Sequence, residues 1–363
     1  MTEFKKVNKI LVFRSCCLGD IAMLTPIICN LHEQFPNTEI KISSSKWIMN
    51  LLPYLPFIND VILFDAPFET NAFKRIVKTV KFILILRKEK FDLVFLSNRH
   101  SIYGLIMKLS GIKYRLGFDE TKYLTDTVPY DHSDHFVVRH NKVLQAAGIK
   151  ADNNNLKLIP KQLNEEILKE YGLDECGLII GIFPFGGTNP GTMMSIKQWE
   201  YHKYVELVSS LAESHKNITT LFFEGYIEQE TITDEFKQGN VRKLKINFDL
   251  ISICDIFISG DTGPLFVAEG LGVSTLSIFG PTDAEKIAPQ SKTPGVIHKV
   301  IWHRPECSPC YTSITAFDRD SEKYWDGNTF ICNTGTHICI KSISVEEIKK
   351  ELESMIEILS KTV

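Results

Sequence analysis

The sequence predicts an α/β protein built from two Rossmann-like domains, and two observations support this prediction. Short apolar stretches of strand length alternate with longer stretches of helical periodicity along most of the chain, as expected where helices connect parallel strands. The alternation stops in the polar stretch 150–161 and starts again at Leu178. Because open α/β sheets bind ligands beyond the carboxyl ends of their strands, we expect two domains that face each other across a ligand-binding cleft.

The first half is expected to begin with a strand over 10–13, a loop over 14–20 and one helix over 21–35. Apolar residues in this helix recur at helical spacing, and a strand over 39–43 completes a βαβ unit. The alternation then continues with further strands at 61–64, 91–96 and 114–118, and with helices at 73–87, 102–109 and 135–147.

The second half repeats this plan. Ser344 and Glu347 have the spacing of a capping box, which predicts a final helix that ends near Leu359. We expect a first domain over 1–160, a second over 161–340 and a C-terminal helical segment over 341–363. Within the second domain, strands are expected at 178–183, 218–223, 256–258 and 275–279, and a helix at 199–214.

The stretch Ser259–Gly272 has the composition of a strand end, a tight turn and a helix start. Gly260 and Gly263 allow the backbone to turn sharply and to approach a ligand. Pro264 suits the first helical position, where its missing N–H group costs little. The free N–H groups and the positive dipole of such a helix start favour a phosphate group. A purely structural glycine turn is the alternative that these residues leave open.

Composition and charge argue against several classes of protein. Hydrophobic residues make up 44% of the 363 residues and charged residues 23%, which is typical of a globular protein. The net charge of −3 argues against a nucleic-acid binder, which needs a basic surface. No stretch reaches the roughly 18 apolar residues of a membrane span, and the apolar run 10–13 is too short for the core of a signal peptide. We therefore expect a cytoplasmic protein that binds no nucleic acid.

The nine cysteines fall into two groups. Near the C-terminus, Cys307 and Cys310 form a Cys-x-x-Cys pair that Cys332 and Cys339 follow. Four such thiols can ligate a metal tetrahedrally, so a structural zinc or iron ion is one interpretation, and free or paired thiols are the other. The remaining five lie in apolar or strand–turn settings and indicate a reducing compartment rather than a disulfide framework: Cys16, Cys17, Cys29, Cys176 and Cys254.

Motifs spread over nearly the whole chain resemble those of glycosyltransferase family 9, the heptosyltransferases that build the inner core of lipopolysaccharide. The most specific are Ser259-Gly260-Asp261-Thr262-Gly263-Pro264 and, behind it, Ile278-Phe279-Gly280-Pro281-Thr282-Asp283. The others are Ile10-Leu11-Val12-Phe13-Arg14-Ser15 with Leu18-Gly19-Asp20 and Thr25-Pro26, then Lys197-Gln198-Trp199, and Gly225 with Glu228.

This resemblance implies a GT-B fold, in which the first domain mainly holds the acceptor and the second the nucleotide sugar. The final helix of this fold usually crosses back to the first domain. The implied reaction is inverting transfer of heptose from ADP-heptose to an inner-core acceptor, and it requires no catalytic metal or other cofactor. The acceptor would be a lipid-linked or other glycan, and the enzyme would work in the cytoplasm or at the inner face of the inner membrane.

The resemblance also assigns catalytic roles to two residues. Asp20 would be the general base that takes the proton from the acceptor hydroxyl, although its position alone favours the N-cap of a helix. Lys197 would neutralise charge on the leaving diphosphate, and the alternative is a solvated surface lysine.

Donor binding is expected from a second set of residues. Asp261 would accept hydrogen bonds from sugar hydroxyls, because a carboxylate beside a diphosphate would repel it, while Thr262 and Gly263 would donate to the phosphates. Glu228 would bind a ribose hydroxyl, and Thr188 would add a hydroxyl from a loop that is longer than the family pattern. The alternatives are a turn-forming aspartate and a surface glutamate. The full set is Thr188, Glu228, Asp261, Thr262, Gly263 and Pro264.

Two other segments carry weaker signals. The triplet Asp318-Arg319-Asp320 has the form of a metal–diphosphate motif, but it lies in a charged, irregular segment and we expect a solvated loop. The apolar stretch 76–88 carries basic residues and could touch a membrane that bears the acceptor. The interpretation that we favour is a packed helix of the first domain.

The sequence bears on three alternative functions. The same chemistry on a protein or another glycan is kept open by the four C-terminal cysteines. A non-catalytic nucleotide-binding protein would need no carboxylate at Asp20. A Rossmann oxidoreductase is disfavoured, because no Gly-x-Gly-x-x-Gly motif follows the first strand.

Overall fold

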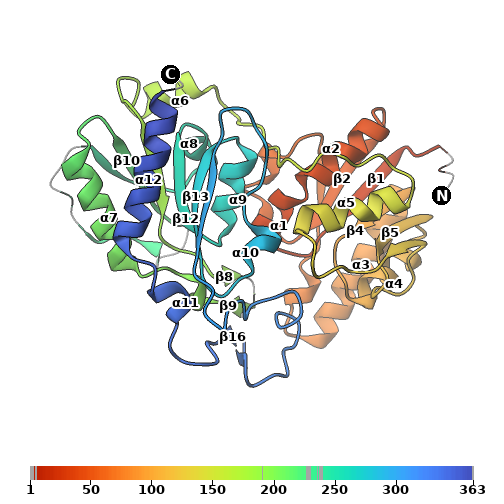
Figure 1. Cartoon of the computed structure of the whole chain (residues 1–363). Coiled ribbons are helices and arrows are strands. Elements are labelled where there is room, and N and C mark those ends of the chain that lie inside the picture. The colour runs from red at the N-terminus through yellow and green to blue at the C-terminus, as the bar shows by residue number, and fades with distance from the viewer. Residues whose placement is uncertain are drawn as a thin grey trace. The chain divides into compact units, whose positions relative to one another are not determined.

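The computed structural model describes residues 4, 6–189, 191–225, 230–234, 236 and 240–361. The chain divides into two compact units, Met1–Ile159 and Pro160–Val363, and each contains its own parallel sheet (Figure 1). The boundary between them falls at the end of the polar stretch 150–161, where the sequence pattern is interrupted. Two α/β domains with parallel sheets are therefore present, as predicted.

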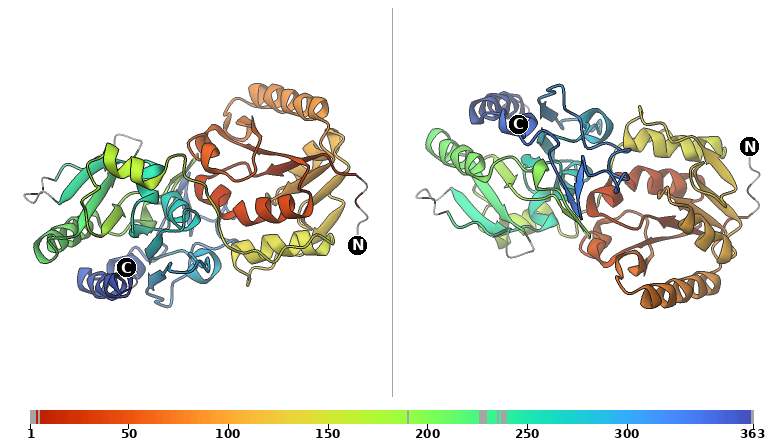
Figure 2. Two further views of the ribbon diagram at one scale, coloured as in Figure 1. Left: turned by 90° about the horizontal axis from the view of Figure 1, so that it is seen from above. Right: turned by 90° about the horizontal axis from the view of Figure 1, so that it is seen from below.

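The sheet of the first unit has six parallel strands in the order β3-β2-β1-β4-β5-β6. The helices α2 and α5 pack beside each other, as do α3 and α4, and these two pairs cover opposite faces of the sheet (Figure 2). The strands are β1 (Lys9–Phe13), β2 (Glu39–Ser44), β3 (Asp60–Leu63), β4 (Leu93–Leu96), β5 (Tyr114–Phe118) and β6 (Asp126–Val128). The α-helices are α1 (Leu18–Met23), α2 (Thr25–Gln34), α3 (Ala72–Glu89), α4 (Ser101–Leu109) and α5 (Phe136–Ala146). Short 3₁₀ turns lie at Lys46–Ile48, Leu52–Tyr54 and Ala66–Phe68.

The prediction of one helix over 21–35 is wrong, because two helices, α1 and α2, share this segment and meet at Leu24. The break comes from Pro26, which lies in the first turn of α2 and has no N–H group to continue the hydrogen bonds of α1. The hydroxyl of Thr25 donates to the carbonyl of Ala22 at 2.7 Å and so satisfies one acceptor at the end of α1.

The sheet of the second unit also has six parallel strands, in the order β11-β10-β7-β12-β13-β14. Its two edge strands, β11 and β14, were not predicted, because they are partly exposed and rich in basic residues. The strands are β7 (Ile179–Phe183), β10 (Thr219–Glu224), β11 (Val241–Lys245), β12 (Ile256–Gly260), β13 (Ser274–Phe279) and β14 (His298–Trp302). The helices are α6 (Asn164–Glu170), α7 (Tyr201–Ser214), α8 (Phe248–Ser252), α9 (Gly263–Gly270), α10 (Ala284–Ile287), α11 (Ile338–Lys341) and α12 (Val345–Ser360), with a 3₁₀ turn at Ser195–Lys197.

The last helix, α12, packs on α7 within the second unit. Its buried residues Val345, Ile348, Leu352 and Met355 recur at helical spacing and belong to the core that α7 and the sheet of this unit form. The apolar face of this helix thus belongs to the second unit, and its expected return to the first domain stays a prediction. The predicted cap is present, since the Ser344 hydroxyl accepts a hydrogen bond from the N–H of Glu347 at 3.2 Å.

A small third sheet in the second unit has the order β15-β16-β9-β8 and consists of two-residue strands. It has its own apolar cluster of Met194, Ile196, Trp325 and Phe330. The residues of the triplet 318–320 are exposed, as a solvated loop would be. Within the described ranges, no helix is both long and apolar enough to cross a bilayer. The strands of this sheet are β8 (Thr188–Asn189), β9 (Thr192–Met193), β15 (Trp325–Asp326) and β16 (Thr329–Phe330).

Candidate functional site

Asp20 lies where β1 ends and α1 begins, at the carboxyl edge of the first sheet. It occupies the third position of α1, and Cys17 is the N-cap. The alternative that Asp20 is itself the N-cap is therefore wrong. One carboxylate oxygen, Oδ2, accepts hydrogen bonds from Arg14 Nη2 at 2.8 Å, Arg14 Nε at 3.3 Å and the Cys17 N–H at 3.2 Å. These hydrogen bonds link Asp20 to two residues of the preceding loop and fix the orientation of the carboxylate.

The other oxygen of Asp20, Oδ1, has no hydrogen-bond donor among the residues described, and the side chain is 25% exposed. Burial lowers the pKa of Arg14, but the adjacent charge of Asp20 and their hydrogen bond outweigh this effect and raise it overall. Arg14 is therefore a permanent cation beside the Asp20 carboxylate. The arrangement presents an oriented carboxylate with one accessible oxygen, which is what a general base requires.

Arg14 is itself held by residues from other elements. Its Nη1 lies 3.4 Å from the hydroxyl of Ser97, which follows β4, and Ser97 pairs with His140 Nε2 at 2.9 Å. Burial, with a smaller contribution from nearby arginines, lowers the pKa of His140 to about 3. His140 is therefore neutral at pH 7, and its Nδ1–H donates to the Phe136 carbonyl at 2.7 Å. This leaves Nε2 to accept from Ser97, so the chain of contacts fixes Arg14.

A group of arginines beside Ser97 was not identified from the sequence. The guanidinium carbons of Arg99 and Arg139 lie 4.0 and 4.3 Å from the ring centre of Tyr130. Arg99 also pairs with Glu120 at 3.1 Å. The sequence signal that could have identified Arg99 is its position three residues after the end of the buried strand β4. Ligands bind at the carboxyl edge of such sheets. Both arginines are largely buried, since Arg139 is 4% exposed and the Arg99 side chain 11%.

The loop before α1 contains a disulfide bond between Cys16 and Cys17. Two of the five cysteines that were expected to indicate a reducing compartment are therefore paired in this structure. The bond joins adjacent residues and connects no separate elements, so it is not a disulfide framework. The other seven cysteines are free.

In the second unit, β12 leads through Asp261 and Thr262 into α9. Thr262 is the N-cap but its hydroxyl does not cap the helix, because it pairs with the Ser259 hydroxyl at 3.0 Å. Gly263 is the first helical residue and Pro264 the second, one position later than predicted. The backbone N–H groups at this helix start thus have no side-chain cap, which suits an anionic group.

Lys197 and Asp261 form a nearly buried ion pair beside this helix start. Lys197 Nζ lies 2.6 Å from Asp261 Oδ2, and the two side chains are 10% and 8% exposed. Thr282 Oγ1 donates to the same carboxylate oxygen at 2.7 Å, and the Lys197 ammonium lies 4.1 Å from the centre of the Tyr311 ring. The alternative of a solvated surface lysine is therefore wrong, because the Lys197 side chain is largely buried and contacts the Asp261 carboxylate and the Tyr311 ring.

The glycine loop after β7 must pass close to Thr262. A Cβ atom on Gly186 would lie 2.3 Å from Thr262 Cγ2, and the φ angle of Gly186 is +133°. Only glycine fits both constraints without a shift of the backbone. The loop therefore lies against the start of α9, and the side-chain amide of Gln198 donates to the Gly186 carbonyl.

Two predicted donor-binding residues, Thr188 and Glu228, are not among the described residues around Lys197 and Asp261. Thr188 is exposed on β8, where its strand pairs with β9, and no described hydrogen bond joins it to Asp261 or Lys197. The segment after Gly187, predicted to be longer than the family pattern, forms this hairpin. Glu228 lies outside the described residues.

The four C-terminal cysteines lie within electrostatic reach of one another. Burial, followed by the charges of Cys310, Cys307 and Cys332, raises the pKa of Cys339 to about 12. Among the described residues, however, no group of three or more His, Cys, Asp or Glu side chains is arranged to hold a metal ion. The four thiols are thus neighbours, but their positions are not those of a closed metal site.

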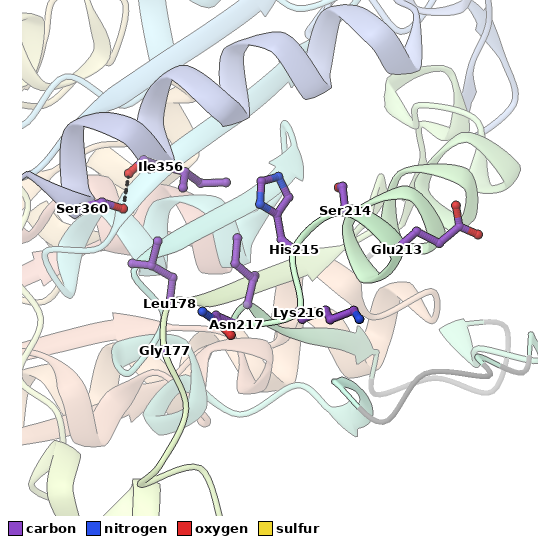
Figure 3. A pocket seen from close by; sticks show the side chains of 10 residues that line it. Gly177, Leu178, Glu213, Ser214, His215, Lys216, Asn217, Ile356 and Ser360 are labelled. Carbon is purple, nitrogen blue, oxygen red and sulfur yellow. Dashed lines mark hydrogen bonds between the residues drawn. The ribbon is translucent and has the colours of Figure 1, made fainter.

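A pocket of about 540 Å³ lies at the opposite edge of the second sheet (Figure 3). Leu178 and Ile218 in its wall immediately precede β7 and β10, so it is at the amino ends of these strands. His215 from the end of α7 and Ile356 and Ser360 from α12 also line it. None of the predicted site residues borders this pocket, and it is not the candidate active site.

Comparison with known proteins gives a consistent result. The sequence profile of glycosyltransferase family 9 (heptosyltransferase) matches residues 79–315. The chain belongs to glycosyltransferase family 9. It is 24% identical to lipooligosaccharide heptosyltransferase 2 of Campylobacter jejuni, over 96% of this chain and 99% of that protein.

Two solved structures have the same fold. A family 9 glycosyl transferase from Veillonella parvula superposes with a TM-score of 0.75 at 16% identity, covering 98% of this chain and 99% of that chain. The Escherichia coli ADP-heptose LPS heptosyltransferase II gives a TM-score of 0.70 at 18% identity, covering 98% of this chain and all of that chain. The GT-B fold and the assignment as a glycosyltransferase are thus confirmed.

Proposed function

We propose that this glycosyltransferase moves heptose from ADP-heptose to an inner-core acceptor of lipopolysaccharide, with inversion at the anomeric carbon. The observation that carries the proposal is the enclosed Lys197–Asp261 pair beside the uncapped start of α9, in a chain of the heptosyltransferase family. The names of the Campylobacter jejuni and Escherichia coli relatives support heptose and ADP-heptose as the sugar and donor. We further propose that the enzyme works in the cytoplasm, at the inner face of the inner membrane.

On the acceptor side, Asp20 acts as the general base. Its accessible Oδ1 takes the proton from the acceptor hydroxyl while that oxygen forms a bond to the anomeric carbon of the sugar. Arg14 keeps Oδ2 occupied and holds the carboxylate in one orientation.

On the donor side, the bond between the anomeric carbon and the diphosphate oxygen breaks, and ADP leaves with the bonding electrons. Lys197 and the N–H groups at the start of α9 stabilise the negative charge that develops on ADP. Asp261 holds Lys197 through Oδ2, and its Oδ1 is assigned to the sugar hydroxyls. Thr262 and Gly263 donate to the phosphates. Thr188 and Glu228 remain proposed contacts of the donor.

A transfer assay tests this function directly. Purified enzyme is incubated with a truncated core acceptor that lacks heptose and with ADP-heptose, a UDP-sugar or a GDP-sugar. We expect product only with ADP-heptose. Product from another nucleotide sugar would replace the donor, and transfer to protein but not to the core would replace the acceptor. No transfer with any pair, despite a folded protein, would contradict the proposal.

We also propose that Cys307, Cys310, Cys332 and Cys339 hold a structural zinc or iron ion. The donor set suits such an ion, and hydrogen bonds to Cys332, which outweigh the effect of its burial, lower the pKa of that thiol. Tyr311, whose ring lies over Lys197, directly follows Cys310, so an ion here would fix one wall of the donor site. Elemental analysis of anaerobically purified protein should find one metal per chain. Four titratable thiols and no metal would contradict this assignment.

A further inference from the structure

The helix α3 (Ala72–Glu89) leaves most of its apolar side chains outside the core of the first unit. Only Phe82 and Leu86 are buried, so the favoured interpretation of a packed helix holds for one face alone. Figure 2 shows α3, in orange, at the outer side of the first sheet. On the other face, the exposed fractions are 74% for Phe73, 62% for Ile76, 50% for Val80 and 56% for Leu84.

These four residues form a continuous stripe, because their spacings of three, four and four residues keep them on one side of a helix. Contiguous apolar surface of this kind is uncommon on a monomer and marks a site of interaction.

Basic residues border this stripe. Lys74, Lys81 and Lys88 are seven residues apart and form a row along the helix next to the apolar side chains. No carboxylate among the described residues lies within 4.0 Å of their ammonium groups. The only acidic residue of α3, Glu89, is paired with Lys9 and Lys41. The exposed face is thus apolar and positively charged, in a chain whose net charge is −3.

We infer that α3 is a docking surface for an anionic lipid membrane. An amphipathic helix with an apolar stripe and a lysine border lies in the plane of a bilayer, where the stripe enters the acyl boundary and the lysines meet anionic head groups. Charge also favours a membrane over a second copy of the chain as the partner of this face. Two copies that met through it would bring their lysine rows together and repel each other. The inference deepens the proposed function, because it gives an enzyme with a lipid-linked acceptor a defined surface for reaching the bilayer.

Vesicle sedimentation tests the inference without donor or acceptor. The whole protein is mixed with phosphatidylcholine vesicles that contain or lack phosphatidylglycerol, at low and high salt. We expect binding to the anionic vesicles that weakens as salt rises. The variant K74Q/K81Q/K88Q should bind roughly a hundredfold more weakly, since each lysine near such a surface contributes about fivefold. The variant I76S/V80S/L84S should lose the residual vesicle binding that the wild type keeps at high salt.

A matched control is K169Q/K216Q/K350Q, which removes the same charge from exposed lysines of the second unit and should bind as wild type does. All of these side chains are exposed, and circular dichroism verifies that each variant is folded. Both α3 variants should keep their transfer rate on a soluble acceptor, so that failure of docking and failure of the proposed function are distinguishable. The inference is overturned if the wild type binds no vesicles, if the α3 variants bind as tightly as wild type, or if the control loses binding equally. A dimer that I76S/V80S/L84S abolishes would also overturn it, in favour of a second copy.

Discussion

Each unit places an aspartate just beyond the end of a central strand, but the two aspartates have different surroundings. Asp20 is paired with Arg14 from the same loop at 2.8 Å, and its side chain is 25% exposed. Asp261 is paired with Lys197, a residue 64 positions away in the sequence, at 2.6 Å, and its side chain is 8% exposed. The first pair is therefore local and open, and the second is long-range and enclosed.

This difference separates the two chemical roles. In the first pair the anion has an accessible oxygen and the cation is a guanidinium that stays protonated, so the pair can accept a proton at Asp20. In the second pair the enclosed ammonium lies beside a helix start, where it can respond to negative charge on a leaving group. The comparison leads to four predictions, which differ in whether they affect transfer, donor binding or stability.

The largest effect is expected from Asp20→Ala. Without the general base, kcat should fall by about 10³-fold, within the usual range for this type of catalysis, while affinity for ADP stays at the wild-type value. Steady-state kinetics and calorimetric titration measure these two quantities. Asp152→Ala, which changes a largely exposed aspartate of the same unit, is the control and should leave kcat unchanged. Near-normal transfer by Asp20→Ala would remove the assigned role.

The next largest effect is expected from Lys197→Ala. Loss of the ammonium should lower kcat by about 10²-fold, as for other groups that stabilise developing negative charge. Affinity for ADP should fall as well, because the same ammonium faces the bound diphosphate, and this loss distinguishes Lys197 from Asp20. Lys203→Ala, at a lysine of α7 that pairs with Glu200, provides the comparison. Equal affinities of Lys197→Ala and wild type for ADP would contradict the assignment.

A smaller effect, on stability, is expected from Gly186→Ala. The added Cβ would meet Thr262 Cγ2 at 2.3 Å in a backbone conformation that alanine disfavours, so the free energy of unfolding should fall by about 1–3 kcal/mol. ADP affinity should fall with it, because Thr262 precedes α9. Gly191→Ala is a matched control with a φ of +72° and no heavy atom within 4 Å of the new Cβ. If the two variants lose equal stability, backbone strain rather than contact with Thr262 explains the result.

The last effect is a pH dependence of stability, which is small near neutral pH and grows as the pH falls. Burial lowers the pKa of His140 in the first unit to about 3, and that of His298 in the second to about 4, from an ordinary value of 6.5. The unfolded chain therefore binds more protons than the native chain below pH 6.5, and stability is lost as the pH falls. Each histidine should lower the unfolding free energy by up to about 1.4 kcal/mol per pH unit between pH 6.5 and 4.

Urea unfolding at several pH values measures this slope. His140→Asn should remove the contribution of the first unit, whose one tryptophan is Trp47, while Trp199, Trp302 and Trp325 lie in the second. The exposed residue His202 gives a control, His202→Asn, that should leave the slope unchanged. A slope that His140→Asn does not alter would mean that this histidine is protonated in the native state.

Most of the fold could be predicted from the sequence because local patterns determine it. The buried strands β1, β7, β12 and β13 are continuous apolar runs, and such runs are typical of parallel sheets. The edge strand β11 could not be predicted in this way, because none of its side chains is buried and its three basic residues are exposed. The packing of α12 on α7 was also missed, since periodicity shows that a helix has an apolar face but not which element covers it.

The site could be predicted only in part, because a sequence pattern does not show which distant residues meet in the folded chain. A strand end followed by glycine and aspartate identifies Asp20 and Asp261 as candidates. The partners Arg99, His140 and Thr282 come from other elements, so only the folded chain brings them near these loops. The stripe on α3 shows a further limit, because an apolar helix has the same sequence pattern whether its second face is covered or exposed.

Calorimetric titration of ADP, UDP and GDP into wild type, Asp20→Ala and the double variant Asp261→Ala/Lys197→Ala tests the division of roles most directly. We predict that wild type and Asp20→Ala bind ADP with the same affinity and prefer it to UDP and GDP, while the double variant binds it much more weakly. Wild-type affinity for ADP in the double variant, or loss of affinity in Asp20→Ala, would contradict the assignment of donor binding to the second unit and proton transfer to the first.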